Sequence, residues 1–336
     1  MNNHTSSLEL SHFPVMLNEV IKISSPSKGG TYIDCTFGGG GYTEKLLKFP
    51  NTFVKGLDRD KTVNPIAKKL EKKFPKRFQF YQIKFSQLDT VSEKFVDAII
   101  FDLGLSSIQL NDLERGFSFK STKSLDMSMG LSKISAQDVV NNLSELNLKQ
   151  IIKILGEEKE ASKIAKNIIK FRKEKKITKV NELVKIIEKS KKKNYANKIN
   201  PCTKTFQALR IFVNKEITEL INGIVKATKI LKPGGKILIV SFHSIEDKIV
   251  KFLFSNFSAN KSKPSRYFPD VTTNNTALFE AYRNKIIKPT NEEINKNYPS
   301  RSAKLRYATR SQNEFTYPEE LLDKFKKYLD LEATTV

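Results

Sequence analysis

The segment from Thr31 to Tyr42 constrains the fold more than any other part of this chain. A short β-prone run, Thr31 to Cys35, leads directly into four consecutive glycines, Gly38 to Gly41. Glycine has no Cβ, so the backbone can turn sharply there and approach a bound molecule closely. Further on, Phe53 to Leu57 is predicted to form a second strand that delivers Asp58 to its carboxyl end. An acidic residue at about this offset meets an adenosine ribose in nucleotide-binding α/β sheets, which predicts a nucleotide-cofactor site.

The glycine run alone does not identify its ligand. Gly38 to Gly41 are compatible with a dinucleotide, a flavin or S-adenosylmethionine, and a tight structural turn is the simplest alternative. Asp58 favours an adenosine ligand, because one carboxylate can accept both ribose hydroxyls in charge-assisted hydrogen bonds. The competing interpretation is that Asp58 is an N-cap for the segment that begins with Arg59 and Asp60.

Four short apolar runs have the pattern of buried parallel strands. They are Thr31 to Cys35, Phe53 to Leu57, Val96 to Phe101 and Lys236 to Val240. Helical patterns separate some of them, which predicts an α/β fold with a doubly wound sheet and ligands at the carboxyl ends of the strands. A polar stretch from Phe257 to Ser300 is expected to be a long surface excursion before Ala303 to Tyr307 returns as a last strand.

The strand pattern stops between about Leu110 and Phe206, where helical signals replace it. A capping box from Ser135 to Asp138 opens one helix, and Ser144 can cap a second. Apolar stripes from Ala161 to Ile169 and from Leu183 to Ile187 predict two more helices. We therefore expect a small helical domain inserted after the fourth strand of the sheet.

The net charge is the second strong constraint. The chain has 336 residues, more than a usual single domain, and 59 Lys and Arg against 36 Asp and Glu give a net charge of +23. This excess predicts a polyanionic partner; the alternative is a proteome in which lysine is the default surface residue. Residues 151 to 200 hold 16 Lys and Arg against 6 Glu. That local excess indicates either phosphate contacts or solvated loops between helices.

Cysteine content and hydropathy indicate the cellular compartment in which the protein works. Cys35 and Cys202 are too few for a disulfide framework and lack the spacing of a metal site. No run approaches the roughly 18 apolar residues of a membrane span, and the polar N-terminus lacks the apolar stretch of a secretory signal. We expect a cytoplasmic protein with no metal and no membrane segment. The oligomeric state stays open, a homodimer included.

Polar residues also follow two later strands of the predicted sheet. Asp102 ends one strand and leads into a turn that contains Ser106 and Ser107. A methyltransferase places its acceptor-positioning loop here, whereas a hydride-transfer enzyme has no reason for this cluster. The alternative is that Asp102 caps the turn and the two serines begin a helix. His243 follows the last parallel strand at the same edge, although a lone histidine is more often a helix cap or a packed neutral ring than a catalyst.

At this point the chain resembles a known family, the bacterial ribosomal RNA small-subunit methyltransferase H family, also called MraW. The likeness runs in order from His12 to Arg306, and eight segments in register make it specific. These segments are His12–Val20, Asp34–Gly41, Asp58–Asp60, Asp102–Leu110, Arg115–Phe119, Leu125–Met129, Thr205–Asn214 and Ser241–Asp247.

The resemblance implies a class I, Rossmann-like methyltransferase sheet that carries an inserted all-helical domain. Residues 1–110 and 207–336 would form the cofactor domain, and residues 111–206 the inserted substrate-recognition domain. The implied reaction is S-adenosylmethionine-dependent methylation of cytosine N4 in the decoding region of small-subunit ribosomal RNA, within the assembled subunit. In addition to Gly38 of the glycine run, the implied cofactor contacts fall on Gly40, Gly41, Tyr42, Asp58, Phe85, Asp102 and Gln109.

Two positions depart from the family pattern. Tyr42 stands where histidine is common, and Ile108 stands where proline is usual. Tyr42 leaves the cofactor contact of that side chain open, and Ile108 loosens the turn after Ser107. Neither change removes a backbone N–H donor.

The catalytic hypothesis is that Asp102, Ser106 and Ser107 present acceptors to the protons of the cytosine amine, with His243 lining the same pocket. One alternative is a DNA cytosine-N4 or adenine-N6 methyltransferase, although Asp-Leu-Gly stands where those enzymes carry a Pro-Pro-Tyr or Pro-Pro-Phe motif. Another alternative is a non-catalytic RNA-binding or ribosome-assembly factor that keeps a nucleotide fold.

Overall fold

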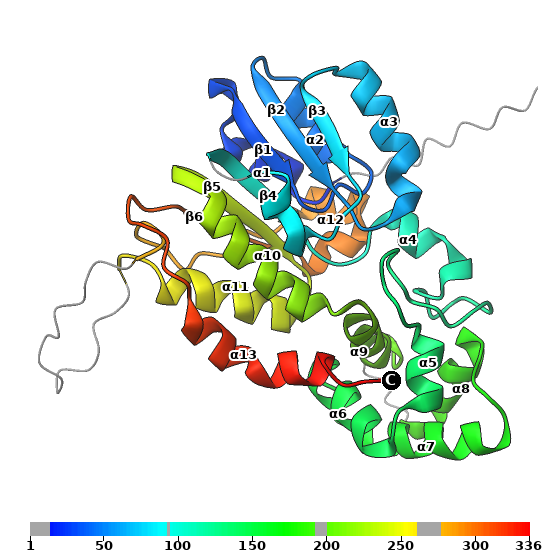
Figure 1. Ribbon diagram of the computed structural model, residues 1–336. Helices are drawn as coiled ribbons and strands as arrows, with labels where there is room; N and C mark the ends of the chain where they lie inside the picture. The colour runs from blue at the N-terminus through cyan, green and yellow to red at the C-terminus, as the bar shows by residue number, and fades with distance from the viewer. Residues whose placement is uncertain (1–13, 93–94, 192–199, 261–276) are drawn as a thin grey trace, which may run out of the picture.

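A computed structural model describes residues 14–92, 95–191, 200–260 and 277–336. Its centre is a six-stranded sheet with the order β3-β2-β1-β4-β5-β6, in which only β6 runs antiparallel (Figure 1). The strands are β1 (Gly30–Asp34), β2 (Thr52–Leu57), β3 (Phe78–Tyr81), β4 (Val96–Asp102), β5 (Leu231–Ser241) and β6 (Lys304–Thr309). Strand order reverses between β1 and β4, so the crevice for a ligand opens at the carboxyl ends of these two strands.

The α/β sheet is confirmed, and the five strands expected from the sequence are all present. β3 was not predicted. It is only four residues long, lies at the sheet edge and keeps just Phe78 fully buried, so it lacks the continuous apolar run of the inner strands. Because β3 comes before it, β4 is indeed the fourth strand and the helical segment follows it.

Helices cover both faces of the sheet, and the side chains of β4 alternate between two apolar cores. Ile99 and Phe101 belong to the core under α10, α11 and α13, whereas Ala98 and Ile100 belong to the core under α1, α2 and α3. The helices around the sheet are α1 (Leu17–Ser24), α2 (Gly41–Leu47), α3 (Asn64–Lys73), α4 (Ser107–Asn111), α10 (Glu216–Ile230), α11 (Ser244–Asn256), α12 (Asn291–Lys296) and α13 (Glu319–Glu332). Short 3-10 turns are η1 (Pro26–Lys28), η2 (Lys61–Val63), η3 (Phe85–Thr90), η4 (Leu113–Arg115) and η5 (Tyr298–Ser302).

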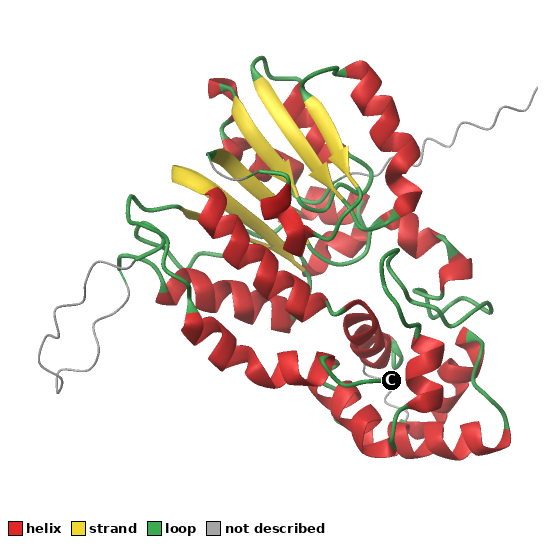
Figure 2. Cartoon of the chain, in the orientation of Figure 1, coloured by secondary structure: helices red, strands yellow, loops and turns green. Residues whose placement is uncertain are grey.

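The segment after β4 is helical, as predicted, and Figure 2 shows no strand among its described residues. Its helices are α5 (Ala136–Asn142), α6 (Glu145–Leu155), α7 (Ala161–Glu174), α8 (Val180–Ser190) and α9 (Thr203–Asn214). Ser135 forms the expected capping box with Asp138, and the Ser144 hydroxyl accepts the N–H of Asn147. α9 continues without a break through the expected domain boundary at residues 206 and 207.

The stretch expected to be a surface excursion is partly internal. Residues 261–276 lie outside the described ranges, but Leu278 and Phe279 are fully buried, and the Phe279 ring packs edge-on against Phe254. The sequence did not show this because two apolar residues among many polar ones have no periodic pattern. The same excursion contains α12 and η5, which reach the carboxyl end of the sheet.

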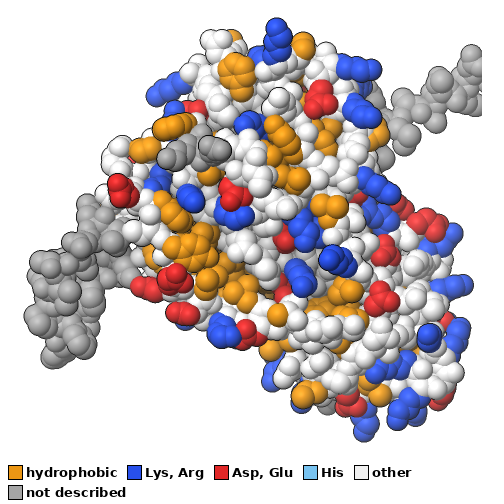
Figure 3. Space-filling view, viewed as in Figure 1, with side chains coloured by type: hydrophobic (Ala, Val, Ile, Leu, Met, Phe, Trp, Pro, Cys, Tyr) orange, Lys and Arg blue, Asp and Glu red, His pale blue; other side chains and the backbone are white. Residues whose placement is uncertain are grey.

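Several cations of the helical segment have partners inside the protein, although Figure 3 shows many Lys and Arg side chains spread over its surface. Arg172 donates to the carbonyl of Val140, and Lys191 pairs with the buried Glu158. Lys192 and Lys193 lie outside the described ranges. Cys35 and Cys202 are both buried free thiols. None of the helices in the described ranges combines the length and apolar character needed to cross a bilayer.

Candidate active site

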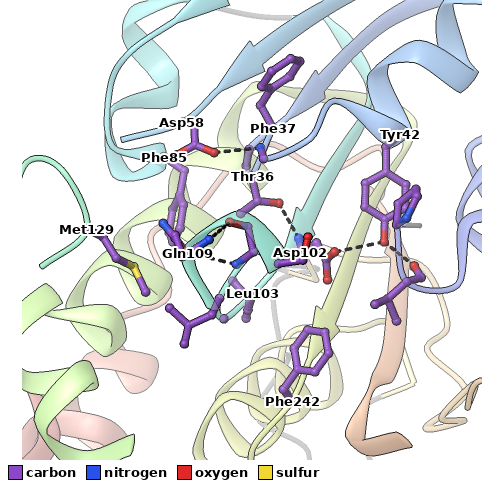
Figure 4. A pocket seen from close by; sticks show the side chains of 18 of the residues that line it. Thr36, Phe37, Tyr42, Asp58, Phe85, Asp102, Leu103, Gln109, Met129 and Phe242 are labelled. Atoms are coloured by element: carbon purple, nitrogen blue, oxygen red, sulfur yellow. Dashed lines mark hydrogen bonds between the residues drawn. The ribbon is translucent and has the colours of Figure 1, made fainter. Parts of the chain in front are cut away.

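A pocket of about 290 Å³ opens at the carboxyl ends of β1, β2 and β4. Its walls come from the glycine turn after β1, the turn after β4, the first turn of α10, and the end of α12 with the start of η5. Figure 4 shows Asp102 in the middle of this pocket, with Asp58 and Phe85 on one side and Tyr42 on the other. The predicted residues at three different strand ends therefore line one cavity.

The glycine turn is positioned by backbone conformation and close packing. Gly38 has φ +50° and Gly40 has φ +75°, a region that favours glycine. A Cβ on Gly41 would lie 2.5 Å from Cγ of Pro14, and a Cβ on Gly40 would lie 2.9 Å from the Phe37 ring. Gly38, Gly41 and Tyr42 line the pocket, whereas Gly40 shapes the turn from outside the lining. A cofactor contact at Gly40 stays a prediction.

Asp58 joins the ends of β1 and β2. One carboxylate oxygen accepts the N–H of Gly38 at 2.8 Å, and the other accepts the N–H of Asp60 at 2.8 Å. Burial raises the pKa of Asp58 to about 6, and these two hydrogen bonds act against that rise. The N-cap of the next helical turn is Asp60, which accepts the N–H of Thr62, so the capping alternative for Asp58 is wrong.

Asp102 has one carboxylate oxygen without a partner in the described structure. Its N–H donates to the Thr36 hydroxyl at 2.7 Å, and one carboxylate oxygen lies 3.4 Å from the Tyr42 hydroxyl, which also donates to the carbonyl of Val15. The second oxygen is buried with no hydrogen-bond partner. Burial, followed by the charge of Asp34, raises the pKa of Asp102 well above its ordinary value. A buried, unpartnered acceptor at a ligand pocket is a site where a bound donor group is stabilised.

The turn after β4 is organised by Gln109. Ser106 and Gln109 form a capping box: the Ser106 hydroxyl accepts the Gln109 N–H, and the Gln109 side chain accepts the Ser106 N–H at 3.1 Å. The Gln109 amide also donates to Asp60 at 2.9 Å. Burial opposes ionisation of Asp60, but hydrogen bonds from Gln109, Thr62 and Arg115 outweigh it and lower its pKa. The two serines thus begin a helix, as the alternative expected, and both also line the pocket.

His243 caps α11 and is not among the residues that line the pocket. Its Nδ1 accepts the N–H of Glu246 at 3.4 Å, and Glu246 in turn accepts the N–H groups of Phe242 and His243. The helix-cap interpretation is therefore confirmed. Phe242 and Glu246 reach the pocket in its place. A catalytic role for His243 stays a prediction.

Carboxylates that the sequence analysis did not select also line the pocket. The first turn of α10 contributes Glu216 and Glu219, and Glu246 begins α11. Arg210 donates to both oxygens of Glu216 at 2.8 Å, and Lys84 lies 3.2 Å from Glu219. Nothing in the local pattern of an amphipathic helix indicates which first-turn acid will face a distant strand end. With Asp58 and Asp102, these acids bring five carboxylates to a pocket wall that also contains Arg59, Lys84 and Lys296.

The sequence predicted no metal site. Ligand atoms of Glu216, His243 and Glu246 lie within 4.8 Å of one another. Both oxygens of Glu216 are already occupied by the guanidinium of Arg210, which supplies a positive charge at this place. The guanidinium of Arg210 thus accounts for the close approach of these groups as an ion-pair cluster.

Hydrogen bonds connect the residues that follow β2 to the helical segment. Arg59 donates to the carbonyl of Asn214 at 2.9 Å, and the Asn214 amide donates to the carbonyl of Met127 while accepting the N–H of Met129. Arg115 bridges Asp60 and the carbonyl of Ser128. Met129 lines the pocket. The segment before α5 is thus part of the site wall.

Phe85 lies opposite the turn after β4 and has a fixed ring position. It packs edge-on against Phe101 with 5.5 Å between ring centroids, and a Cβ on Gly223 of α10 would lie 2.7 Å from its ring. Its other side lines the pocket near Asp58 (Figure 4). A flat apolar ring beside an acid suits an adenine next to its ribose.

Comparison with known proteins agrees with these observations. Residues 9–311 match the MraW methylase family. The ribosomal RNA small subunit methyltransferase H of Ehrlichia canis is 43% identical over 300 residues, which cover 88% of this chain and 98% of the relative. The protein of the same name from Bartonella bacilliformis is 44% identical over 301 residues, 90% of each chain.

Among solved structures, an rRNA methylase from Streptococcus thermophilus covers 87% of this chain and 96% of its own, with 11% identity and a TM-score of 0.39. That likeness is too distant to bear on the site. The family match and the relatives instead show the family of this chain. The chain belongs to the MraW methylase family, and it is a methyltransferase with a class I, Rossmann-like sheet.

Proposed function

We propose that this protein transfers a methyl group from S-adenosylmethionine to the N4 amine of a cytosine in the decoding region of small-subunit ribosomal RNA. The observation that carries the proposal is the convergence of Gly38, Asp58 and Asp102 on one pocket at the point where strand order reverses. The names of the relatives support ribosomal RNA as the substrate.

The pocket residues fit this cofactor chemically. Asp58 would accept the ribose hydroxyls, Phe85 would lie against the adenine, and the turn from Gly38 to Gly41 would let the cofactor approach the backbone. When bound, the cofactor supplies an electrophilic methyl group on a positively charged sulfonium. Asp102 would favour that charge, because its carboxylate lines the pocket without a cation partner and offers an unpartnered oxygen as an acceptor inside it.

The amine of cytosine is a poor nucleophile, because its lone pair is delocalised into the ring. Asp102, Ser106 and Ser107 would orient the amine through its protons, and positioning of this kind supplies up to about 7–11 kcal/mol in intramolecular reactions. The positive charge of the cofactor favours the ionised form of Asp102, whose environment makes it a stronger base than an ordinary aspartate. Asp102 can therefore take the proton that the amine loses as the N–CH₃ bond forms.

The RNA must present an unstacked base to this pocket, because an amine within a stack cannot reach it. We assign residues 111–206 to substrate recognition and the remainder to cofactor binding. The net charge of +23 would support phosphate contacts, so binding to the RNA should weaken steeply as salt is added. A substrate within the small ribosomal subunit would place the protein in the cytoplasm.

The test is incubation of the protein with methyl-labelled cofactor and small ribosomal subunits from cells that lack this activity, followed by nucleoside analysis. N4-methylated cytidine is the expected product. Asp102→Ala should abolish transfer at saturating cofactor, while Asp330→Ala, at an exposed site on α13, should not. Label in adenosine, or none in the wild-type reaction, would contradict the proposed function.

A further inference from the structure

The first residue of η5, Tyr298, is an exposed aromatic residue next to the pocket wall. Lys296, Asn297 and Pro299 line the pocket, and Tyr298 stands between them in sequence. The Tyr298 side chain is 65% exposed, although both of its sequence neighbours face the cavity. The Tyr298 ring is therefore an exposed side chain whose two sequence neighbours belong to the pocket wall.

Sheet register fixes the side of the molecule on which this ring lies. β6 begins at Lys304, and Lys304 pairs with Ser241 at the carboxyl end of β5. Residues 298–302 come immediately before β6, so they lie at the same edge of the sheet as Asp102. Figure 1 shows α12, in orange, below the carboxyl ends of β1 and β4.

Hydrogen bonds and burial fix the backbone on both sides of Tyr298, although the Tyr298 side chain itself is exposed. The Glu293 carboxylate accepts the N–H of Met16 at 2.6 Å, and Ser300 is fully buried. Backbone hydrogen bonds from Ser300 to Asn297 and from Ala303 to Ser300 close the turn around Tyr298. A ring on a fixed backbone loses little conformational entropy when a ligand covers it.

The planar guanidinium of Arg301 lies over the ring of Tyr298. The guanidinium carbon of Arg301 lies 4.2 Å from the centroid of the Tyr298 ring, a cation–π contact between two exposed side chains. An aromatic ring joined to a guanidinium is the combination that single-stranded nucleic acids stack on, because every base has a π-face and every nucleotide a phosphate. An isolated exposed tyrosine would need no explanation, but this one has both the cation and the pocket beside it.

We propose that Tyr298 and Arg301 form a stacking platform for a nucleobase that neighbours the methylated cytosine. This inference rests on the proposed function, since it takes RNA as the substrate. The platform would hold the flanking nucleotide while the target base turns into the pocket. It would contribute to RNA affinity and leave the cofactor site unchanged.

The experiment measures RNA affinity, the KM for small subunits and the cofactor Kd for the wild type and for Tyr298→Ala, Tyr298→Leu and Tyr298→Phe. Stacking on one ring is worth about 1–3 kcal/mol per base, so the Ala and Leu variants should bind RNA about tenfold more weakly, with an unchanged cofactor Kd. Tyr298→Phe should keep wild-type affinity, because it keeps the ring. Tyr317→Ala, at another exposed tyrosine, is the matched control.

Wild-type RNA affinity in both Tyr298→Ala and Tyr298→Leu would overturn the platform and leave the proposed function standing. An equal loss in Tyr298→Phe, or a weaker cofactor Kd in any of the three variants, would also overturn it, since the hydroxyl or the pocket shape would then be responsible. Absence of methyl transfer by the wild type would count against the proposed function alone, because the RNA-binding measurement does not depend on catalysis. Melting temperatures of all variants show which of them are folded.

Discussion

The carboxylate of Asp58 accepts the backbone N–H of Gly38 at 2.8 Å. The acid that ends β2 thereby holds the glycine turn that follows β1, so the two parts of the expected cofactor site position each other. Only one of its two oxygens is used in this way; the other accepts the N–H of Asp60. Each oxygen keeps further lone pairs for a ribose hydroxyl.

Replacement of this acid should weaken cofactor binding more than it weakens folding. In Asp58→Asn the amide can accept at only one atom, and its NH₂ group faces a backbone donor. Hydrogen bonds to a charged group are worth about 1.5–3 kcal/mol, so calorimetry should show a cofactor Kd raised at least about tenfold. Asp330→Asn on the exposed face of α13 serves as control, and an unchanged Kd in Asp58→Asn would refute the assignment.

Cofactor affinity should also depend on pH through the same carboxyl. The pKa of Asp58 is raised to about 6, so the group is ionised at neutral pH and becomes protonated as the pH falls through 6. Protonation removes acceptor capacity, and the Kd should therefore rise below about pH 6. Titration of the wild type and Asp58→Asn should show this rise only in the wild type; identical pH profiles would mean that another group is responsible.

Two matched glycine-to-alanine substitutions can distinguish the effect of backbone strain on stability from the effect of pocket shape on cofactor binding. Gly38 and Gly234 both have positive φ, +50° and +79°, so alanine at either should cost roughly 1–2 kcal/mol of stability. A Cβ on Gly38 would point between Thr36 and Ser106 at the pocket, whereas a Cβ on Gly234 would meet nothing within 4 Å. Chemical denaturation should show similar losses, but only Gly38→Ala should weaken cofactor binding. Equal cofactor affinities in the two variants would contradict this account of the turn.

The turn after β4 should depend on Gln109. Gln109→Leu leaves the Ser106 N–H without its acceptor and removes a donor from Asp60. One unsatisfied group of this kind costs about 1–3 kcal/mol, so kcat should fall about tenfold or more as the acceptor-positioning turn loosens. Gln150→Leu on the exposed surface of α6 should behave as wild type. If only the cofactor Kd changed and kcat did not, Gln109 would be a direct cofactor contact instead of a positioning residue.

Much of the fold could be predicted because inner parallel strands are buried on both faces and therefore read as continuous apolar runs. β4, with Val96 and Ala98 to Phe101 all fully buried, is the clearest case. β3 was not predicted, because an edge strand of four residues has no such continuous apolar run. The capping box of α5 could be predicted because it is local in sequence.

The site was predictable where its residues come from strand ends. Gly38, Asp58 and Asp102 lie together because parallel strands bring their carboxyl ends to one edge, and that relationship can be read from the chain. Glu216 and Pro299 could not be found in this way. Their approach to the pocket depends on how α10 and the segment before β6 pack, which no local pattern encodes. His243 illustrates the opposite error, since its position at a strand end suggested a pocket residue, but its ring caps α11.

The most direct test of the account is a crystal structure of the protein with S-adenosylhomocysteine, the product left after methyl transfer. The account predicts the ribose hydroxyls on the carboxylate of Asp58, the adenine beside Phe85 and the sulfur directed toward Asp102. A ligand bound elsewhere, or a pocket closed by protein side chains at saturating ligand, would contradict it.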